Sequence, residues 1–332
     1  MATARLAPMR SFGARWGSRT LPVRVPPPYA HRMHPPDPQQ NWLVFGGSGA
    51  VGGFLLKRLS AHGFDVLALS RRGGQAELPG LQWRLGSLEQ ASALDDALQG
   101  FAPAVICSAG PLDAFVDWLA QRPPCAGTRV LALSSLSASW KLDSPQPAER
   151  ALAQRLCDAE RALFELCTQA EASACVLRVG LIHGAGVDRS LSPLLRLARR
   201  LRVLPWPRAA RGLRQPVHAD DVARALLAAA ARDWRNQAAA APLQLPGPEA
   251  LDFASMLRRS FACETPSPRL LCLPMPGLQR MARHLAAGSN RLGRAAAVAF
   301  RLHVDQLADI GDWHRLNIAP VTLQRLGPSE RC

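Results

Sequence analysis

From Asn41 onward, short apolar runs alternate along the chain with longer amphipathic windows. The runs predict strands at Trp42–Phe45, Val66–Leu69, Leu81–Leu85, Ala104–Cys107, Val130–Leu133 and Cys175–Val179. Helices are predicted in the intervals, most clearly Ala50–His62, Leu88–Leu98, Ala148–Thr168 and Ala219–Ala231. Because strands that alternate with helices form βαβ units, the pattern predicts an α/β protein with a Rossmann-type, doubly wound parallel sheet.

The pattern divides the chain into three parts. Residues 1–40 begin with an acid-free, arginine-rich stretch and a proline cluster, so we expect a disordered tail. Such a start resembles an organelle transit peptide, but a start codon assigned upstream of Met33 is the explanation that we favour. Residues 41–241 form the predicted Rossmann domain. The rhythm weakens afterwards, so residues 242–332 are expected to be a small C-terminal region on the substrate side.

The formal net charge of +15 raises the question of a nucleic-acid partner. All but two of the 40 basic residues are arginine, the exceptions being Lys57 and Lys141, in a chain rich in Ala, Gly and Pro. That composition indicates codon bias in a GC-rich genome, and nothing in the chain resembles a base-stacking platform. We therefore expect no nucleic-acid partner. No apolar stretch approaches the roughly 20 residues that a membrane span needs, so none is predicted.

The eight cysteines include no CxxC pair and no histidine at metal-ligand spacing. No metal site is predicted. Thiols of this kind, without a secretory signal, favour a reducing, cytoplasmic compartment.

A glycine-rich turn follows the first strand of the Rossmann domain and leads into a helix. It comprises Gly46, Gly47, Ser48, Gly49, Ala50, Val51 and Gly52. The first glycine permits the sharp turn, the second lets the backbone approach a pyrophosphate, and the third lets the helix pack on the strand. The N-terminus of the helix then presents free N–H groups and a positive dipole end to the phosphates. The motif in this context predicts dinucleotide binding.

The end of the second strand indicates which dinucleotide is preferred. An acidic residue there would accept hydrogen bonds from the ribose 2′-hydroxyl, but this chain has Ser70, Arg71 and Arg72. Arginine pairs with a 2′-phosphate as a charged, bidentate donor. The sequence therefore predicts NADP as the preferred cofactor, with NAD as the alternative, although a solvated loop in an arginine-rich protein would look the same.

These residues resemble the extended short-chain dehydrogenase/reductase superfamily, in particular NAD-dependent epimerase/dehydratase (nucleoside-diphosphate-sugar epimerase) proteins. The resemblance covers about residues 41–325. Besides the glycine turn, it rests on four segments: Cys107–Gly110 after the fourth strand, Ser134–Ser135 after the fifth, Leu177–Gly184 after the sixth, and Arg214–Ala223 before a late helix.

The resemblance implies further cofactor contacts. Residues matching the family's pattern are Ser108, Ala109 and Gly110 beneath the ribose and pyrophosphate, Gly180 beside the nicotinamide, Ser134 at the end of the fifth strand, and Ser87 with Leu88 near the adenine. Ser87 replaces an acidic residue that the family usually carries there, so the adenine contact is the weakest part of this set. His218 lies in a loop that is structural in the family.

The family's chemistry depends on Tyr and Lys four residues apart, because the lysine lowers the tyrosine pKa. The single tyrosine of this chain is Tyr29, outside the predicted domain. With Glu160 matched to the family's glutamate, Leu152 and Leu156 occupy the two positions. We interpret these leucines as part of an apolar helix face.

Two hypotheses about function follow. In the first, the protein is an oxidoreductase or epimerase acting on a small molecule such as a nucleotide sugar. Ser135, His183 or Asp143 would then be the substitute acid or base. Leu136 occupies the position where the family usually carries Ser or Thr. In the second, it binds NADP without turnover, as a sensor, scaffold or assembly factor. The sequence leaves open whether the protein is an enzyme. It also leaves the oligomeric state open, with a homodimer as the arrangement favoured by the long helices of this fold.

Overall fold

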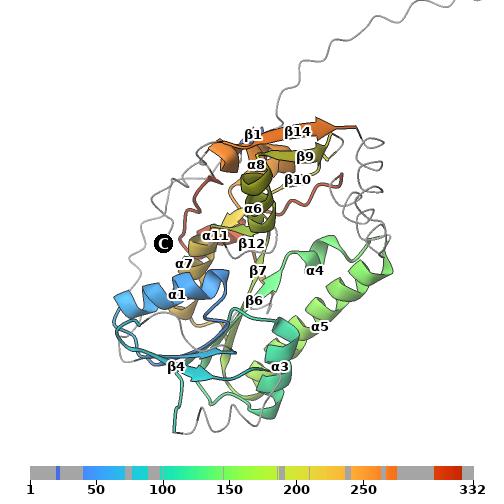
Figure 1. Cartoon of the computed structure of the whole chain (residues 1–332). Coiled ribbons are helices and arrows are strands. Elements are labelled where there is room, and N and C mark those ends of the chain that lie inside the picture. The colour runs from blue at the N-terminus through green and yellow to red at the C-terminus, as the bar shows by residue number, and fades with distance from the viewer. Residues whose placement is uncertain are drawn as a thin grey trace, which may run out of the picture.

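A seven-stranded parallel sheet forms the centre of the computed structural model (Figure 1). The structure describes residues 20–22, 40–71, 77–88, 98, 100–144, 146–184, 186, 191–208, 210–235, 241–262, 267–274 and 303–323. The strands of the sheet, in spatial order, are β12 (Leu243–Leu245), β7 (Ser173–Val179), β6 (Arg129–Ser135), β5 (Val105–Ser108), β2 (Trp42–Phe45), β3 (Val66–Ser70) and β4 (Leu81–Leu85). In chain order the sheet runs 3-2-1-4-5-6-7, so the predicted Rossmann-type fold class is confirmed.

Helices cover both faces of the sheet. One face carries α1 (Ala50–Ala61) and α7 (Ala219–Ala230), and the other carries α3 (Leu112–Gln121) and α5 (Pro147–Gln169) (Figure 1). Because both faces are buried, the inner strands are apolar at successive positions rather than alternating with polar residues. In β2, Val44 belongs to the core on the α1/α7 face, and its neighbour Leu43 belongs to the core on the α3/α5 face.

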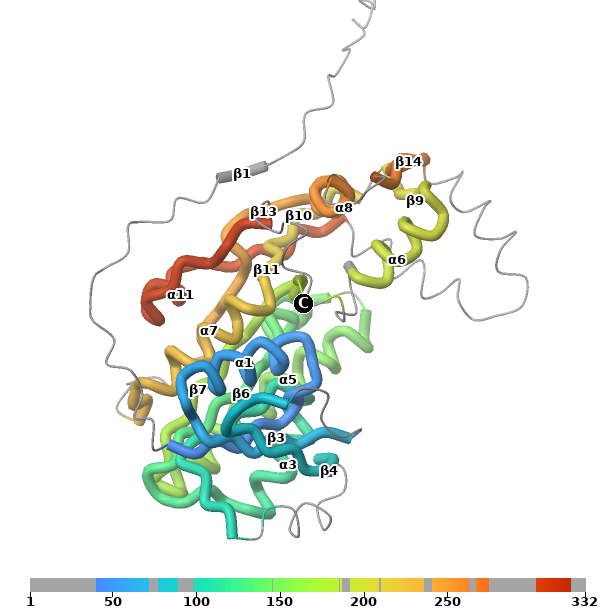
Figure 2. Tube along the Cα trace, turned by 60° about the vertical axis from the view of Figure 1, so that its left-hand side comes forward, coloured from blue at the N-terminus to red at the C-terminus, as the bar shows by residue number. Residues whose placement is uncertain are grey.

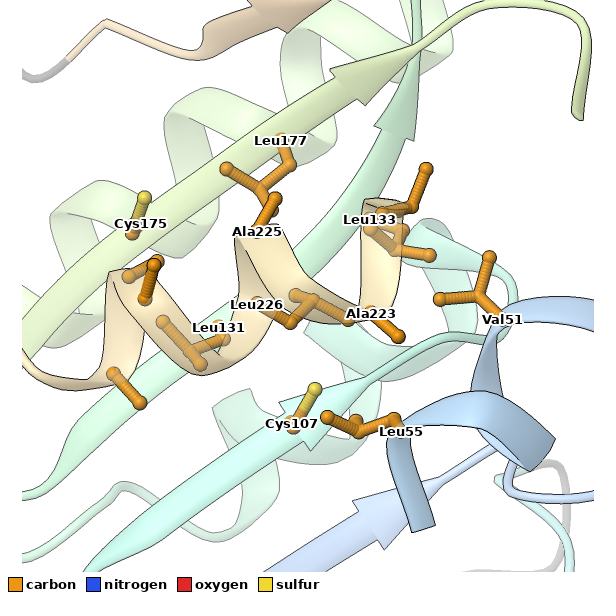
Figure 3. Packing of buried hydrophobic residues seen from close by; sticks show 14 of the residues in the cluster. Val51, Leu55, Cys107, Leu131, Leu133, Cys175, Leu177, Ala223, Ala225 and Leu226 are labelled. Atoms are coloured by element: carbon orange, nitrogen blue, oxygen red, sulfur yellow. The ribbon is translucent and has the colours of Figure 1, made fainter. Parts of the chain in front are cut away.

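Small side chains let α7 lie close to the sheet and to α1. Ala223, Ala225 and Leu226 pack over β6 and β7, and Val51 of α1 approaches them from the side (Figure 3). Arg58 of α1 binds Asp220, the second residue of α7, with 2.5 Å between a guanidinium nitrogen and a carboxylate oxygen. Apolar contact therefore sets the spacing of these two helices, and one ion pair joins their surfaces.

The remaining elements gather beyond the carboxyl ends of the central strands. They are α4 (Ser137–Trp140), β8 (Ile182–His183), α6 (Leu191–Leu201), β9 (Val203–Pro207), β10 (Leu213–Arg214), β11 (Val217–His218), β13 (Glu249–Asp252), α8 (Phe253–Ala262), β14 (Arg269–Leu273) and α11 (Gly311–Arg315). A separate apolar core joins α6, α8, β9 and β14. Figure 2 shows these four elements at the end of the molecule opposite β3 and β4.

Two parts of the structure lie outside the predicted domain limits. The sheet continues past residue 241, because β12 pairs with β7, and α11 packs beside β12 through Trp313. Three residues give β12 too short an apolar pattern to be recognised as a strand. Within the predicted tail, β1 (Thr20–Pro22) pairs antiparallel with β13. Backbone pairing at an edge strand needs no apolar periodicity.

The predicted helix Leu88–Leu98 falls mainly outside the described residues. None of the helices in the described ranges is both long and apolar enough to cross a membrane. The same ranges contain no grouping of His, Cys, Asp or Glu suited to holding a metal ion.

A buried carboxylate connects α7 to the last described segment. Asp221 accepts hydrogen bonds from Arg224 at 2.9 Å and from the backbone N–H of Val321 at 2.7 Å. Burial nevertheless raises the pKa of Asp221 above its usual value, the two hydrogen bonds offsetting only part of the desolvation.

We expect the stability of the unmodified chain relative to the Asp221→Asn variant to fall as the pH rises. Because the folded pKa lies above the unfolded pKa, this carboxyl stabilises the fold least at pH values above both. Urea unfolding of the two proteins at pH 4 and pH 7 measures the change. An asparagine variant whose relative stability decreases between pH 4 and pH 7 would contradict this assignment.

Candidate functional site

The glycine turn lies where the strand order of the sheet reverses, between β2 and β5. Gly46 has a φ of +75°, a left-handed conformation that favours glycine. A Cβ on Gly46 would lie 2.8 Å from the carbonyl carbon of Ala109. A Cβ on Gly52 would lie 2.2 Å from the carbonyl oxygen of Gly46. The first and third glycines therefore have the steric roles that the sequence predicts.

Helix α1 begins immediately after this turn. Gly49 is its N-cap, and the Gly49 N–H donates to the Gly46 carbonyl at 2.9 Å. No side chain of the described residues caps the helix, and its first turn contains no acidic residue. Ser48 is exposed, Ala50 is partly buried, and Val51 packs into the core, so the turn is anchored on one side and open on the other. An uncapped helix N-terminus of this kind suits a phosphate.

The segment after β5 lies directly against the turn. The Ala109 N–H donates to the Phe45 carbonyl at 3.0 Å, and the Gly110 N–H donates to the Ser108 hydroxyl at 3.4 Å. Leu88 comes within 4.0 Å of the position that a Cβ on Gly110 would take. The structure thus brings Ser108, Ala109 and Gly110 to the edge of the glycine turn. Ligands of doubly wound sheets bind at such a switch point.

The end of β3 lies beside the same turn. The Ser70 hydroxyl is buried and donates to the Ser48 hydroxyl at 3.5 Å, and Arg71 follows on the surface. Gly47 belongs to this corner too, since a Cβ there would lie 3.2 Å from the Trp83 ring of β4. Ser87 is partly buried just beyond β4. Arg72 lies outside the described residues.

The two serines that end β6 point to opposite faces of the sheet. Ser134 follows Val130 and Ala132 on the α3/α5 face, and its hydroxyl donates to Glu160 at 2.5 Å. Ser135 is partly exposed on the other side, and its hydroxyl oxygen accepts the Ser137 N–H at 3.1 Å. The Ser134 hydroxyl therefore already donates its hydrogen inside the protein. The predicted contact of Ser134 with the cofactor stays a prediction.

A buried ion pair holds α5 against the sheet, and sequence reasoning assigned no role to it. The Arg178 Nε donates to both oxygens of Glu160, at 2.9 and 3.1 Å, and Arg178 also donates to the Ser139 hydroxyl at 2.8 Å. The hydrogen bond to Glu160 raises the Arg178 pKa, so the guanidinium stays charged although partly buried. Removing one partner of a buried pair costs about 3–5 kcal/mol. Arg178 belongs to a segment that carried the family resemblance, and Glu160 was matched to the family's glutamate, so these two matches are the signal that could have identified the pair.

Leu152 and Leu156 of α5 differ from the other members of their apolar stripe. Both leucines are only partly buried, whereas Ala159 and Leu163 belong to the core on the α3/α5 face. The single apolar face that we predicted is therefore real in the second half of the helix. In the first half the core-facing position is Ala153, which leaves Leu152 and Leu156 half-exposed.

Gly180 lies beneath a cover formed by distant residues. A Cβ on Gly180 would lie 3.2 Å from the Gln215 carbonyl oxygen, 3.5 Å from Leu136 and 3.8 Å from the Trp140 ring. Trp140 and Gln215 in turn hold the segment at residues 303–310. The Trp140 indole N–H donates to the Leu307 carbonyl at 2.9 Å, and the Gln215 amide exchanges two hydrogen bonds with the backbone of residue 308. A strap from the C-terminal region thus closes over the end of β7.

His183 is buried in the two-stranded β8–β11 sheet. Only 3% of its surface is exposed, and its ring lies edge-on to His218 with 5.2 Å between centroids. Gly184 packs over the His218 ring, where a Cβ would lie 2.0 Å from Nε2. His218 also caps α7, because its Nδ1 accepts the Asp220 N–H at 3.3 Å. His218 is therefore the N-cap residue of α7.

Comparison with known proteins agrees with this geometry. Residues 42–126 match the model of the NAD dependent epimerase/dehydratase family. A search of curated proteins finds no match. Among solved structures, MoeE5 in complex with UDP-glucose and NAD is 20% identical, with a TM-score of 0.54 over 70% of this chain and 85% of that chain. UDP-glucose 4-epimerase from Thermotoga maritima, solved with UDP-glucose, is 13% identical, with a TM-score of 0.56 over 70% and 85%. An epimerase from Methanothermobacter thermautotrophicus is 16% identical, with a TM-score of 0.56 over 71% and 80%.

The strand order and the glycine turn define a Rossmann-type α/β fold. The predicted resemblance to the NAD dependent epimerase/dehydratase family is confirmed over residues 42–126 by the family match. The solved structures share the fold of the chain.

Gly52 and Gly53 provide a matched pair of substitutions in α1. Gly52→Ala should destabilise the protein by about 1–3 kcal/mol, because its Cβ meets backbone atoms of the turn that cannot rotate away. Gly53→Ala should stabilise it by about 1 kcal/mol, because the added methyl meets no atom within 4 Å and alanine favours a helix. Chemical unfolding measures both changes. Equal effects of the two substitutions would show that the turn is not closely packed.

Proposed function

We propose that this protein binds NADP(H) across the Gly46–Gly52 turn and the Ser108–Gly110 segment. The observation that carries this proposal is the backbone contact between the two segments, which leaves no room for a Cβ at Gly46 or Gly52. The uncapped N-terminus of α1 supplies N–H donors for a pyrophosphate. A bound nicotinamide would supply hydride transfer. Gly180 would line the nicotinamide side of the site.

The preference for NADP over NAD rests on the end of β3. Ser70 and Arg71 occupy the place where NAD-specific sites carry a carboxylate, and Arg71 is exposed beside the turn. A guanidinium there can pair with a 2′-phosphate, and the Ser48 and Ser70 hydroxyls lie within 3.5 Å of each other at the same corner.

We further propose that the small-molecule ligand is a nucleotide sugar, bound between the carboxyl ends of β6 and β7 and the C-terminal region. This proposal is supported by two solved structures of similar fold that contain UDP-glucose. The reducing cytoplasm remains our proposed compartment, and a homodimer remains an expectation.

Binding rather than rapid turnover is the activity that the side chains favour. Leucines stand at positions 152 and 156, where the family carries its tyrosine and lysine, and neither can transfer a proton. His183 is too deeply buried against His218 to reach a substrate. The non-catalytic sensor, scaffold or assembly role is therefore our first proposal. One observation favours the enzymatic alternative, namely that Ser135 is partly exposed at the end of β6.

Calorimetry should show tighter binding of NADPH than of NADH. Arg71→Ala should weaken NADPH binding by about 1–3 kcal/mol and leave NADH nearly unchanged, because only NADPH carries the charged phosphate. Arg155→Ala removes an equal charge from the exposed face of α5 and serves as the control. Equal affinities for the two cofactors in the unmodified protein would contradict the proposed preference.

With NADP⁺ and UDP-glucose, we expect the unmodified protein to bind both and to show slow turnover or none. General acid–base catalysis contributes about 10²–10⁴ in rate, so the double variant Leu152→Tyr/Leu156→Lys should raise any measurable rate. The variant Leu152→Phe/Leu156→Met changes the same positions without a titratable group and is the matched control.

The pattern of losses separates the alternatives. If the protein is an enzyme that uses Ser135, the Ser135→Ala variant should lose turnover and keep NADPH affinity, whereas His183→Ala should affect only stability. Brisk turnover in the unmodified protein that disappears with His183→Ala would refute the proposed roles of both residues.

A further inference from the structure

The segment from α6 to β11 is strongly basic. Between Leu191 and Ala219 the sequence contains no acidic residue, although the whole chain has 25. The arginines of this stretch are Arg196, Arg199, Arg200, Arg202, Arg208, Arg211 and Arg214. This stretch therefore carries seven positive charges and no negative charge to compensate them.

Helix α6 presents two different faces. Leu194, Leu195 and Ala198 pack into the apolar core shared with α8, β9 and β14. The opposite face is exposed at helical spacing and carries both charge and apolar bulk. Its members are Arg196, Leu197, Arg200 and Leu201, with 44% of Leu197 and 54% of Leu201 exposed. The helix thus leaves two leucines in water between arginines.

The same character continues on the neighbouring strands. Leu204 and Leu270 face the core, so the alternate positions of β9 and β14 face outward. Val203 and Leu271 are exposed among these outward positions, with Arg269 paired in register opposite Val203. We define the leucine–arginine surface as Arg196, Leu197, Arg200, Leu201, Val203, Arg269 and Leu271.

The leucine–arginine surface lies at one end of the molecule. Both views place α6, β9 and β14 together, opposite β4 (Figures 1 and 2). It is also separate from the glycine turn, which follows β2 in the middle of the central sheet.

We propose that the leucine–arginine surface docks this protein on the headgroup layer of an anionic lipid membrane. Arginines gain affinity from the negative surface potential of such a membrane, and leucines beside them bury their side chains at the boundary of the acyl chains. Neither contact requires a membrane-spanning helix.

Other partners fit this surface less well. Single-stranded nucleic acid is bound through aromatic stacking, but the large apolar residues exposed in the described ranges are all leucine or valine. Two copies of the surface would bring arginine against arginine, which opposes self-association. A surface that combines exposed aliphatic side chains with arginines is best matched by a lipid membrane with anionic headgroups.

Co-sedimentation of the full chain with vesicles tests this proposal. The protein should pellet with vesicles of phosphatidylcholine containing phosphatidylglycerol, but not with pure phosphatidylcholine vesicles, and high salt should weaken the binding. The double variant Arg200→Gln/Leu201→Ser should lower the apparent affinity at least ~10-fold, because it removes one charge and one inserting side chain. The matched control is Arg84→Gln/Leu85→Ser on β4, where Leu85 is 67% exposed at the other end of the molecule.

Three results would overturn the proposal. The first is no binding to the anionic vesicles by the unmodified protein, and the second is equal loss in the test and control variants. The third combines two observations: the Leu197→Ser/Leu201→Ser variant binds the vesicles as well as the unmodified protein does, and the unmodified protein binds a single-stranded RNA as tightly as lipid. Together they would indicate a purely electrostatic site for polyanions. Circular dichroism and the thermal midpoint of each variant show that a loss of binding does not come from unfolding.

Discussion

The close approach of two backbone segments at the centre of the sheet is the constraint on which the site depends. A Cβ added at Gly46 or Gly52 would collide with neighbouring backbone atoms. The turn, the start of α1 and the end of β5 therefore form one packed unit. Backbone atoms cannot move aside as a flexible side chain can. The unit therefore holds the N-terminus of α1 at the switch point of the sheet. There the free N–H groups of the helix can donate hydrogen bonds to a ligand at the carboxyl ends of the strands.

The position of α5 depends on electrostatics rather than on apolar packing alone. Glu160 is 3% exposed, yet it receives hydrogen bonds from Ser134 on β6 and Arg178 on β7. A carboxylate in such a place is stable only because several donors compensate its desolvation. Because the network joins one helix to two adjacent strands, it fixes the position of α5 relative to β6 and β7.

The elements outside the central sheet have two separate structural roles. Trp313 and the strap at residues 303–310 return to the Rossmann core and cover the ends of its strands. The second group, α6 with β9 and β14, builds its own small core and leaves leucines exposed beside arginines. The first group lies over the ends of the strands, and the second forms a surface at the end of the molecule opposite β4.

The amino-acid sequence by itself determined six strands of the central sheet, the helices α1, α5 and α7, and the glycine turn, because each is a local signal. Two-sided burial makes a strand continuously apolar, and a turn that admits no Cβ requires glycine. Only the tertiary structure decided which serine of the pair 134–135 lies beside Glu160, that a three-residue strand completes the sheet, and that His183 packs against His218. These features depend on contacts between residues that are far apart in the chain. The sequence could not predict them, because hydrophobic periodicity indicates that a residue is buried but not which residue it contacts.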